Sequence, residues 1–176
     1  MENGKIHIYT GDGKGKTTAA VGLALRAAGQ GKEIYFYQFL KGRNTGEVES
    51  FKGMNEITFS RANPDTKKFF YQMNNQEKEE LREDSQKSWQ EFIDEVITFN
   101  YDIIIIDEVM AAITNKLIDL DQVIELISKK SKEQELVLTG RNAPAELIEL
   151  ADYVTEMKMI KHPYQKNCPP RKGIEF

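Results

Sequence analysis

The chain has 176 residues, of which 40% are hydrophobic and 30% are charged, the composition of a soluble globular protein long enough to bury one core. Its 24 basic and 28 acidic residues give a net charge of −4, which argues against a nucleic-acid partner because a phosphate backbone needs a basic field. No segment suits a signal peptide or a membrane span, and the single cysteine, Cys168, excludes an intrachain disulfide, so we expect one cytoplasmic domain over residues 1–176 with no membrane partner.

Short β-rich runs alternate with helical patterns along the chain. The runs that predict strands are 5–9, 33–39, 56–60, 101–107, 135–139 and 153–157. The fourth run lacks the alternation of a half-exposed strand, which is typical of a strand buried on both faces of a parallel sheet. Strands separated by helices therefore predict an α/β fold with an open parallel sheet of about six strands and helices on both faces.

Three helices are predicted between these strands. Residues 16–28 are apolar nearly all round, as in a helix packed tightly against a sheet. Between Glu77 and Phe99, apolar residues recur at helical spacing: Leu81, Trp89, Phe92, Ile93, Val96 and Ile97. Asp119 and Gln122 match an N-cap and its box-like partner at the start of a third helix. The least regular stretches are candidate walls of a site, because ligands lie beyond the carboxyl ends of the strands: 40–55, 61–76 and the tail from Lys161.

The letters GDGKGKTT at 11–18 follow the first predicted strand and open the first predicted helix. Their G-K-T ending matches the phosphate loop G-x-x-x-x-G-K-[ST], but Thr10 stands where the first glycine belongs and two other glycines are displaced. In this context backbone N–H groups converge on an anion, Lys16 would lie against the phosphates and Thr17 would reach a Mg²⁺ ion. The alternative is a glycine-rich surface turn whose lysines are only solvated.

The strand at 103–107 supplies the second half of a nucleotide-binding signature. It ends in Asp107 and Glu108, where P-loop proteins keep an acidic group for the metal. Acidic residues at a strand end can also simply face solvent. Because both signals occur in the right order and on the right elements, together they favour a nucleotide site with Mg²⁺, or Mn²⁺ in its place, held by Thr17, Asp107 and Glu108.

No residue stands out as a general base for attack at the γ-phosphate. The two histidines, His7 in the first strand and His162 in the tail, are expected to be packed or exposed, since neither is near the loop in sequence. Cys168 is expected to be a bystander. The altered loop and the missing base argue against an ordinary γ-phosphate hydrolase.

Five segments, in order over nearly the whole chain, resemble the P-loop ATP:corrinoid adenosyltransferases, a family that includes the cob(I)alamin adenosyltransferases. They are TGDGKGKTTAAVGLALRAAGQGK, QFLKG, YDIIIIDE, LTGRNAPAELIELADYVTEM and KHPY…RKGIEF. The resemblance implies a P-loop NTPase-like sheet and transfer of the 5′-deoxyadenosyl group of ATP to the Co(I) of a corrinoid. It also implies that the triphosphate lies reversed in the loop, so that the C5′–O bond breaks and triphosphate leaves.

The resemblance also assigns roles on the ATP side. The segment implied to hold the triphosphate comprises Thr10, Gly11, Asp12, Gly13, Lys14, Gly15, Lys16, Thr17 and Thr18. Arg26 matches a family arginine that reaches the phosphates, although the letters LALRAAG alone would favour a surface helix residue. Lys16, Arg26 and Glu108 are thereby implied as the catalytic set.

On the corrinoid side, the family places aromatic residues in the loop before the long helix. They press on the lower face of the corrin and displace its axial ligand, which eases reduction to Co(I). The matching letters here are KKFFYQMNNQE, with Phe69 and Tyr71 as the best matches and Phe70 in reserve. Tyr71 replaces a family Trp, and ordinary packing of the loop is the alternative. Arg171 in the tail is a further candidate contact.

The family also implies a homodimer and raises an electron-donating flavoprotein reductase as a partner. Some members have an N-terminal extension that covers the active site, whereas the first strand here is expected to start by about Lys5. Two other readings stay open. One is a P-loop kinase or ATPase that acts at the γ-phosphate, and the other is a nucleotide-sensing binding module without enzymatic activity.

Overall fold

The computed structural model of the protein describes residues 3–42, 45–63, 68–163 and 168–175. Their strands form one sheet in the order β3-β2-β4-β5-β1-β6, and every neighbouring pair is parallel. The strands are β1 (Ile6–Thr10), β2 (Ile34–Gln38), β3 (Ile57–Arg61), β4 (Ile103–Asp107), β5 (Glu135–Thr139) and β6 (Tyr153–Glu156). The six predicted strands and the predicted parallel α/β sheet are therefore confirmed.

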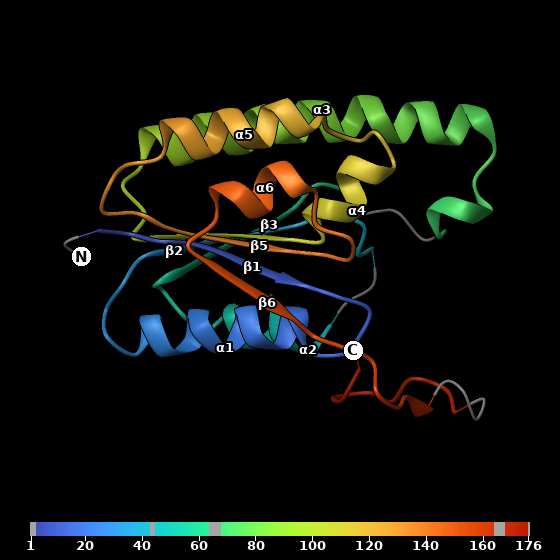
Figure 1. Ribbon diagram of the computed structural model, residues 1–176, viewed down its shortest axis with the longest axis horizontal. Coiled ribbons are helices and arrows are strands. Elements are labelled where there is room, and N and C mark those ends of the chain that lie inside the picture. The colour runs from blue at the N-terminus through green and yellow to red at the C-terminus, as the bar shows by residue number, and fades with distance from the viewer. Residues whose placement is uncertain (1–2, 43–44, 64–67, 164–167, 176) are drawn as a thin grey trace.

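Helices cover both faces of the sheet (Figure 1). On one side lie α1 (Lys16–Ala28) and α2 (Gly46–Phe51). On the other lie α3 (Asn75–Thr98), α4 (Val109–Thr114), α5 (Leu120–Lys129) and α6 (Ala145–Leu150). A short 3₁₀ helix, η1 (Phe70–Gln72), precedes α3. Within the described residues, no helix combines the length and apolarity needed to cross a membrane.

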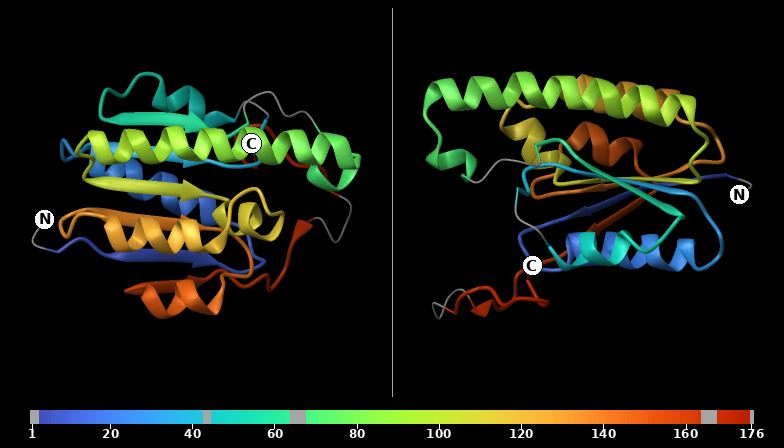
Figure 2. Two further views of the ribbon diagram at one scale, coloured as in Figure 1. Left: turned by 90° about the horizontal axis from the view of Figure 1, so that it is seen from above. Right: turned by 180° about the vertical axis from the view of Figure 1, so that it is seen from behind.

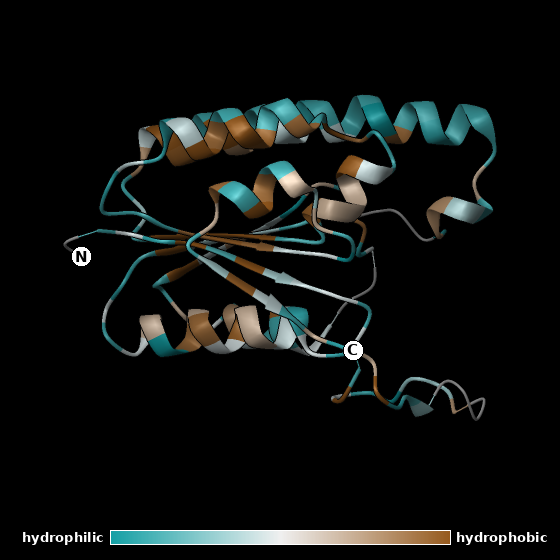
Figure 3. Ribbon diagram, viewed as in Figure 1, coloured by the Kyte–Doolittle hydropathy of each residue, from teal (hydrophilic) through white to brown (hydrophobic). Residues whose placement is uncertain are grey.

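The central strand β4 is buried on both faces, as its letters predict. Ile104 and Ile106 belong to the core beneath α3 to α6, whereas Ile103 and Ile105 belong to the core beneath α1 and α2. Each of the four is at most 4% exposed. Figure 3 shows apolar residues along the strands and hydrophilic residues over much of α3.

The two long helices bury less of their surface than predicted. In α1 the buried apolar residues are alanines, Ala20, Ala24 and Ala27, and Leu25 is 38% exposed. Small side chains let this helix approach the sheet closely, and its opposite face meets solvent because α1 is an outer layer. In α3 the predicted stripe is buried from Leu81 to Val96 except for the partly buried Ile93, and Ile97 is 65% exposed at the last turn.

Helix starts follow local capping chemistry. In α3 the Asn74 side chain accepts a hydrogen bond from the Glu77 N–H (2.9 Å), and the Glu77 carboxylate accepts one from the Asn74 N–H (3.0 Å). This box starts the helix two residues before the predicted Glu77. In α5 the Gln122 side chain accepts a hydrogen bond from the Asp119 N–H at 2.8 Å, which confirms the predicted partner.

Parallel pairing brings all the carboxyl ends of the strands to one edge of the sheet, as Figure 2 shows. Thr10, Gln38, Asp107 and Thr139 are the last residues of β1, β2, β4 and β5. Polar residues that are far apart in sequence thus meet at this edge, which is where open α/β sheets bind ligands.

Candidate functional site

A hollow of about 830 Å³ lies at the carboxyl edge of the sheet, beside the segment 11–18. Its walls include the turn after β2, Phe69 before η1, Arg141 after β5 and part of the tail at 170–175. The three irregular stretches predicted as site walls therefore all contribute to one cavity.

The contact of the phosphate loop with the end of β6 accounts for its unusual glycine spacing. The Gly13 N–H donates to the Met157 carbonyl at 2.6 Å. A Cβ at Gly11 or at Gly13 would lie 2.5 Å from that carbonyl oxygen, so neither position accepts a side chain without movement. Gly11 and Gly15 also have φ angles of 97° and 119°, which favour glycine.

Thr10, which replaces the first glycine of the usual pattern, is the last residue of β1 rather than part of the turn. It is buried, and its hydroxyl accepts a hydrogen bond from the Ala143 N–H at 3.2 Å. This contact joins the end of β1 to the segment after β5, so Thr10 has a structural role in the loop.

The Lys16 side chain is buried within the loop. Its ammonium donates to the carbonyls of Gly11 (2.7 Å) and Gly13 (2.8 Å). Burial lowers the pKa of Lys16, and the nearby Arg141 guanidinium lowers it further. Two cations that face one cavity create a site for an anion, because an anionic ligand would relieve their repulsion.

Asp107 is the centre of a buried polar network. Its side chain is fully buried, and it accepts hydrogen bonds from four side chains. The donors are Thr139 (2.6 Å), Thr17 (2.9 Å), Lys41 (2.9 Å) and Gln38 (3.0 Å). A buried carboxylate is stable only when it is paired and hydrogen-bonded. The network therefore fixes Asp107 against Thr17 of the phosphate loop.

Glu108 is the first residue of the turn into α4 and has a φ angle of 61°, which is rare outside glycine. Its N–H donates to the Thr139 hydroxyl at 3.1 Å, and its side chain lines the cavity. Burial raises the pKa of Glu108, and the neighbouring Asp107 raises it further. One hydroxyl and two carboxylates at this point are hard oxygen ligands, which fit Mg²⁺.

Other residues predicted for the ATP side lie at different depths. Asp12, Lys14 and Thr18 line the cavity from its exposed rim. Arg26 is exposed in the last turn of α1, ten residues beyond Lys16, a rise of roughly 15 Å along the helix. An arginine side chain cannot span that distance, so the structure does not bring Arg26 to the phosphate loop of its own chain.

The three aromatic residues before α3 differ in their surroundings. Phe69 and Tyr71 are 52% and 76% exposed, and their rings stack at 5.5 Å with an interplanar angle of 8°. Phe70 is partly buried against the core, and the Lys78 ammonium lies 5.2 Å from its ring centre. Phe69 also borders the cavity. Of the three, Phe70 has the packing role.

The tail returns over the phosphate loop. The Glu175 carboxylate pairs with the Lys14 ammonium at 2.9 Å and with the Arg171 guanidinium at 3.0 Å. Arg171, predicted as a corrinoid contact, is exposed and anchors Glu175. His162 was expected to lie apart from the loop, but the fold places it in the wall of the same cavity.

Several site residues were missed by the sequence analysis. Gln38 and Lys41 belong to the segment QFLKG, and Thr139 and Arg141 belong to LTGR. Each pair stands at or just after the end of a strand. Their position at the strand ends could have identified them as site residues, because a parallel sheet brings such positions to one edge.

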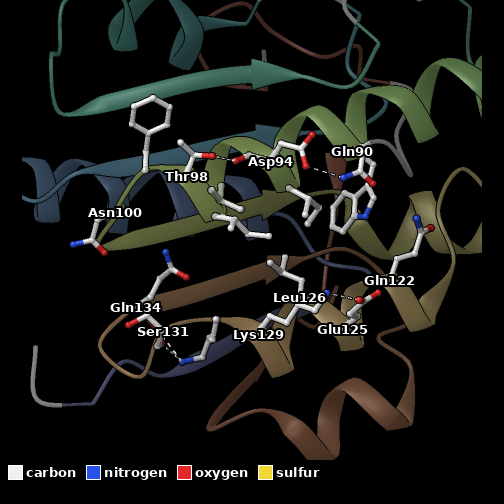
Figure 4. Close-up of a pocket in the computed structure, with 16 residues that line it drawn as sticks. Gln90, Asp94, Thr98, Asn100, Gln122, Glu125, Leu126, Lys129, Ser131 and Gln134 are labelled. Carbon is white, nitrogen blue, oxygen red and sulfur yellow. Dashed lines mark hydrogen bonds and ion pairs between the residues drawn. The ribbon is translucent and has the colours of Figure 1, made fainter.

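A second hollow, of about 470 Å³, lies between α3 and α5 (Figure 4). Its labelled polar contacts join residues about one turn apart, such as Gln90 with Asp94 on α3 and Glu125 with Lys129 on α5. Such pairs stabilise the helices that carry them. The phosphate loop and the acidic Glu108 line the first hollow, which we take as the functional site.

The fold and the site together define a P-loop nucleotide-binding protein. Among solved structures, the KaiC-like protein PH0186 from Pyrococcus horikoshii has a TM-score of 0.53 at 16% identity, covering 91% of this chain and 75% of that one. EssC (ATPases 2 and 3) from Geobacillus thermodenitrificans has a TM-score of 0.52 at 13% identity, covering 98% and 35%. These likenesses concern the fold.

Sequence comparison gives the family. Residues 2–176 match the family ATP:corrinoid adenosyltransferase BtuR/CobO/CobP, and the chain belongs to it. A corrinoid adenosyltransferase of Sinorhizobium sp is 32% identical, with 99% of this chain and 81% of that protein aligned. Those of Pseudomonas aeruginosa (29%) and Escherichia coli K12 (28%) also align with 99% of this chain, and 85% and 87% of their own length is covered.

Proposed function

We propose that the protein transfers the 5′-deoxyadenosyl group of ATP to the Co(I) of a corrinoid and releases triphosphate. In this reaction the reduced cobalt of the substrate supplies the electron pair for a new Co–C5′ bond, and the C5′–O bond breaks with its electrons left on triphosphate. The observation that carries the proposal is the family match over residues 2–176. The loop supports it, because Lys16 lies within the loop and Thr17 lies against Asp107.

The chain's own residues bind and orient the triphosphate in this proposal. Lys16 exchanges its bonds to the Gly11 and Gly13 carbonyls for phosphate oxygens, and Arg141, which lines the same cavity, adds a second positive charge. Cations aimed at the phosphates stabilise the leaving triphosphate. No general base is needed because the nucleophile is the substrate's cobalt, which agrees with the absence of an obvious base beside the loop in the sequence.

Mg²⁺ is proposed to accompany ATP, held by Thr17, Asp107 and Glu108. The ion would neutralise part of the phosphate charge. Thr17 and Asp107 are already joined by a 2.9 Å hydrogen bond, so the hydroxyl and the carboxylate ligand are in place together. A P-loop threonine and an acidic residue after a buried strand are the usual pair for this role.

The exposed ring pair of Phe69 and Tyr71 is proposed as the corrin contact. Two parallel apolar rings that face solvent beside the phosphate cavity offer a surface for a large flat substrate. Arg171 and Arg26 stay proposals from the family resemblance, as do the homodimer and an electron-donating flavoprotein reductase. The cytoplasmic location stays a proposal from the sequence.

Anaerobic incubation with MgATP and chemically reduced cob(I)alamin tests the reaction. The expected products are light-sensitive adenosylcobalamin, followed by its spectrum, and triphosphate in equal amounts. ADP and orthophosphate without an adenosylated corrinoid would instead favour a kinase or ATPase. Bound ATP that stays intact would favour a sensing module.

A matched pair of lysine variants tests the cradle. Lys16→Ala should lower the rate by about 100-fold or more, since a charged contact to the leaving group is lost. Lys129→Ala removes an exposed lysine of α5 and should retain the wild-type rate. Circular dichroism checks that both variants fold, and a folded Lys16→Ala variant with near-wild-type turnover would contradict the assignment.

A further inference from the structure

The Lys41 ammonium lies between two proposed metal ligands. Its Nζ atom is 2.9 Å from an Asp107 carboxylate oxygen and 3.1 Å from the Thr17 hydroxyl. The side chain is partly buried, with 26% exposed, whereas the Asp107 side chain is fully buried. The Asp107 and Thr17 oxygens are therefore already in contact with a cation, which is the Lys41 ammonium of the protein itself.

The other side chains that donate hydrogen bonds to Asp107 are neutral. The neutral donors are Thr17, Gln38 and Thr139. Within the part of the chain that the structure describes, Asp107 forms an ion pair with Lys41. A buried carboxylate requires a compensating positive charge. Before any metal binds, the Lys41 ammonium supplies this charge in direct contact with Asp107, and the Lys16 ammonium adds a second positive charge nearby.

The backbone next to Lys41 has an unusual conformation. Leu40 has a φ angle of 56°, and Glu108, at the end of the adjacent strand β4, has one of 61°. Non-glycine residues in this region are uncommon and are often found at functional sites. Leu40 also packs against the core, so the turn that carries Lys41 is anchored from below.

A divalent ion and an ammonium cannot share this position. Mg²⁺ binds at about 2.1 Å from oxygen ligands, and it would bring a double positive charge next to the ammonium. The ammonium must therefore leave Asp107 and Thr17 when the metal arrives. Lys41 lines the same cavity as the phosphate loop, so the phosphates of a bound nucleotide would lie near its ammonium.

We propose that the Lys41 ammonium occupies the metal position of the nucleotide-free protein, so that a divalent cation enters only with a nucleotide whose phosphates then attract the displaced ammonium. The inference rests on the proposed nucleotide site. Its consequence is an order of binding: metal alone binds weakly, and the metal–nucleotide complex binds tightly.

Mn²⁺ binding, followed by the electron paramagnetic resonance signal of the free ion, tests this in the absence of nucleotide. Lys41→Met should bind Mn²⁺ at least about tenfold more tightly than the wild type, because the competing cation is gone and the oxygen ligands stay. Lys41→Gln, which can still donate to Asp107, is a second neutral variant if Lys41→Met does not fold. Lys41→Arg keeps the charge and should bind Mn²⁺ as weakly as the wild type.

Lys68→Met is the matched control, since Lys68 lines the same cavity but pairs with Glu77. It changes the net charge equally and should alter Mn²⁺ affinity by less than about twofold. If the neutral Lys41 variants gain no more than Lys68→Met, the inference is wrong. Adding Thr17→Val to Lys41→Met should abolish the gain, and a gain that persists would place the ion elsewhere and also overturn it.

Wild-type binding of Mn²⁺ with ATP separates this inference from the proposed function. Tight binding of the Mn²⁺–ATP complex without gain in the neutral variants rejects the role of Lys41 and leaves the nucleotide site intact. Wild-type protein that binds Mn²⁺ equally well with and without ATP rejects the binding order itself. If the products include ADP in place of triphosphate, the proposed reaction is wrong, but the role of Lys41 at the metal position is unaffected.

Discussion

Among single residues, the aromatic side chains before α3 make the clearest case of neighbours with different environments. Phe70 faces the core, whereas Phe69 and Tyr71 stack on one another with most of Tyr71 exposed. The residues on either side of the partly buried Phe70 lie against each other, as their stacked rings show. The choice of Phe69 and Tyr71 over Phe70 in the sequence came from the family resemblance, because the letters alone give the order of the residues and not the direction of their side chains.

Phe69→Ala and Tyr71→Ala test the corrin contact. Each should slow adenosylation of cob(II)alamin under a mild reductant by about threefold to tenfold, the size of a lost aromatic contact, with a smaller effect on pre-reduced cob(I)alamin. The reason is that a ring that displaces the axial ligand matters for reduction, and pre-reduced substrate has passed that step. Initial rates with both substrates are the measurement.

Phe99→Ala is the control for those variants, since Phe99 is 55% exposed just after α3 and is no part of the phosphate cavity. It should leave both rates unchanged. Equal losses with the two substrates in Phe69→Ala or Tyr71→Ala would argue against ligand displacement and favour general binding of the corrin.

Among the elements, the position of β6 depends most on the contacts of one side chain, Asp152. The strand β6 is an edge strand whose four residues are all exposed, and among the described strands it pairs with β1 alone. Just before it, the Asp152 carboxylate accepts a hydrogen bond from the Ile6 N–H at 2.9 Å and pairs with the Lys5 ammonium at 3.1 Å. Because Gly13 binds the Met157 carbonyl just after β6, this strand also supports the phosphate loop.

Asp152→Ala should lower the free energy of unfolding by about 0.5–1 kcal/mol. This is the contribution of a charged hydrogen bond, reduced because the side chain is partly exposed to solvent. The Ile6 N–H, followed by the Lys5 side chain, lowers the pKa of Asp152 below its ordinary 3.8. The stabilisation is therefore present above pH 3.8 and is lost as the pH falls through the lowered value. Urea unfolding between pH 3 and pH 7 is the measurement.

Glu149→Ala, at an exposed carboxylate of α6 close to Asp152, is the control for that variant. Its difference from the wild type should stay within about 0.5 kcal/mol, as for most surface changes. A difference between wild type and Asp152→Ala that grows as the pH falls would contradict the assigned sign.

Prediction of the elements succeeded where the letters repeat a clear physical pattern. The four isoleucines of β4 are buried on both faces, and the stripe of α3 from Leu81 to Val96 is buried except for the partly buried Ile93. The helices α2, α4 and α6 were not predicted, since each has six residues, less than two turns, and offers no helical period to detect. Tertiary packing decides such short segments.

At the scale of the whole molecule, the site is assembled from both ends of the chain. The phosphate loop and Asp107 were predicted from their motif order, but the roles of Lys41 and Arg141 depend on which strands lie side by side. The return of the tail was not predicted either. Glu175 is 161 residues from Lys14 in sequence and still pairs with it, and no local pattern encodes such a contact.

The Glu175 carboxylate pairs with the Lys14 ammonium, which would also attract a phosphate oxygen. Arg171 and then Lys14 lower the pKa of Glu175 to about 2. The charged contact is therefore fully present above the ordinary value of 4.5 and is lost only as the pH falls through about 2. Throughout the pH range of an enzyme assay, the tail and an incoming anion compete for Lys14.

Glu175→Gln should consequently bind inorganic triphosphate about twofold to fivefold more tightly than the wild type, the size of an exposed ion pair. Calorimetry at pH 5.5 and at pH 7.5 should give the same ratio, because Glu175 stays charged at both. Glu146→Gln, at an exposed carboxylate of α6, has the same charge change and should leave the affinity unchanged. Weaker binding in Glu175→Gln would mean that the tail positions Lys14 for the phosphates, and a ratio that falls towards one at pH 5.5 would contradict the lowered pKa.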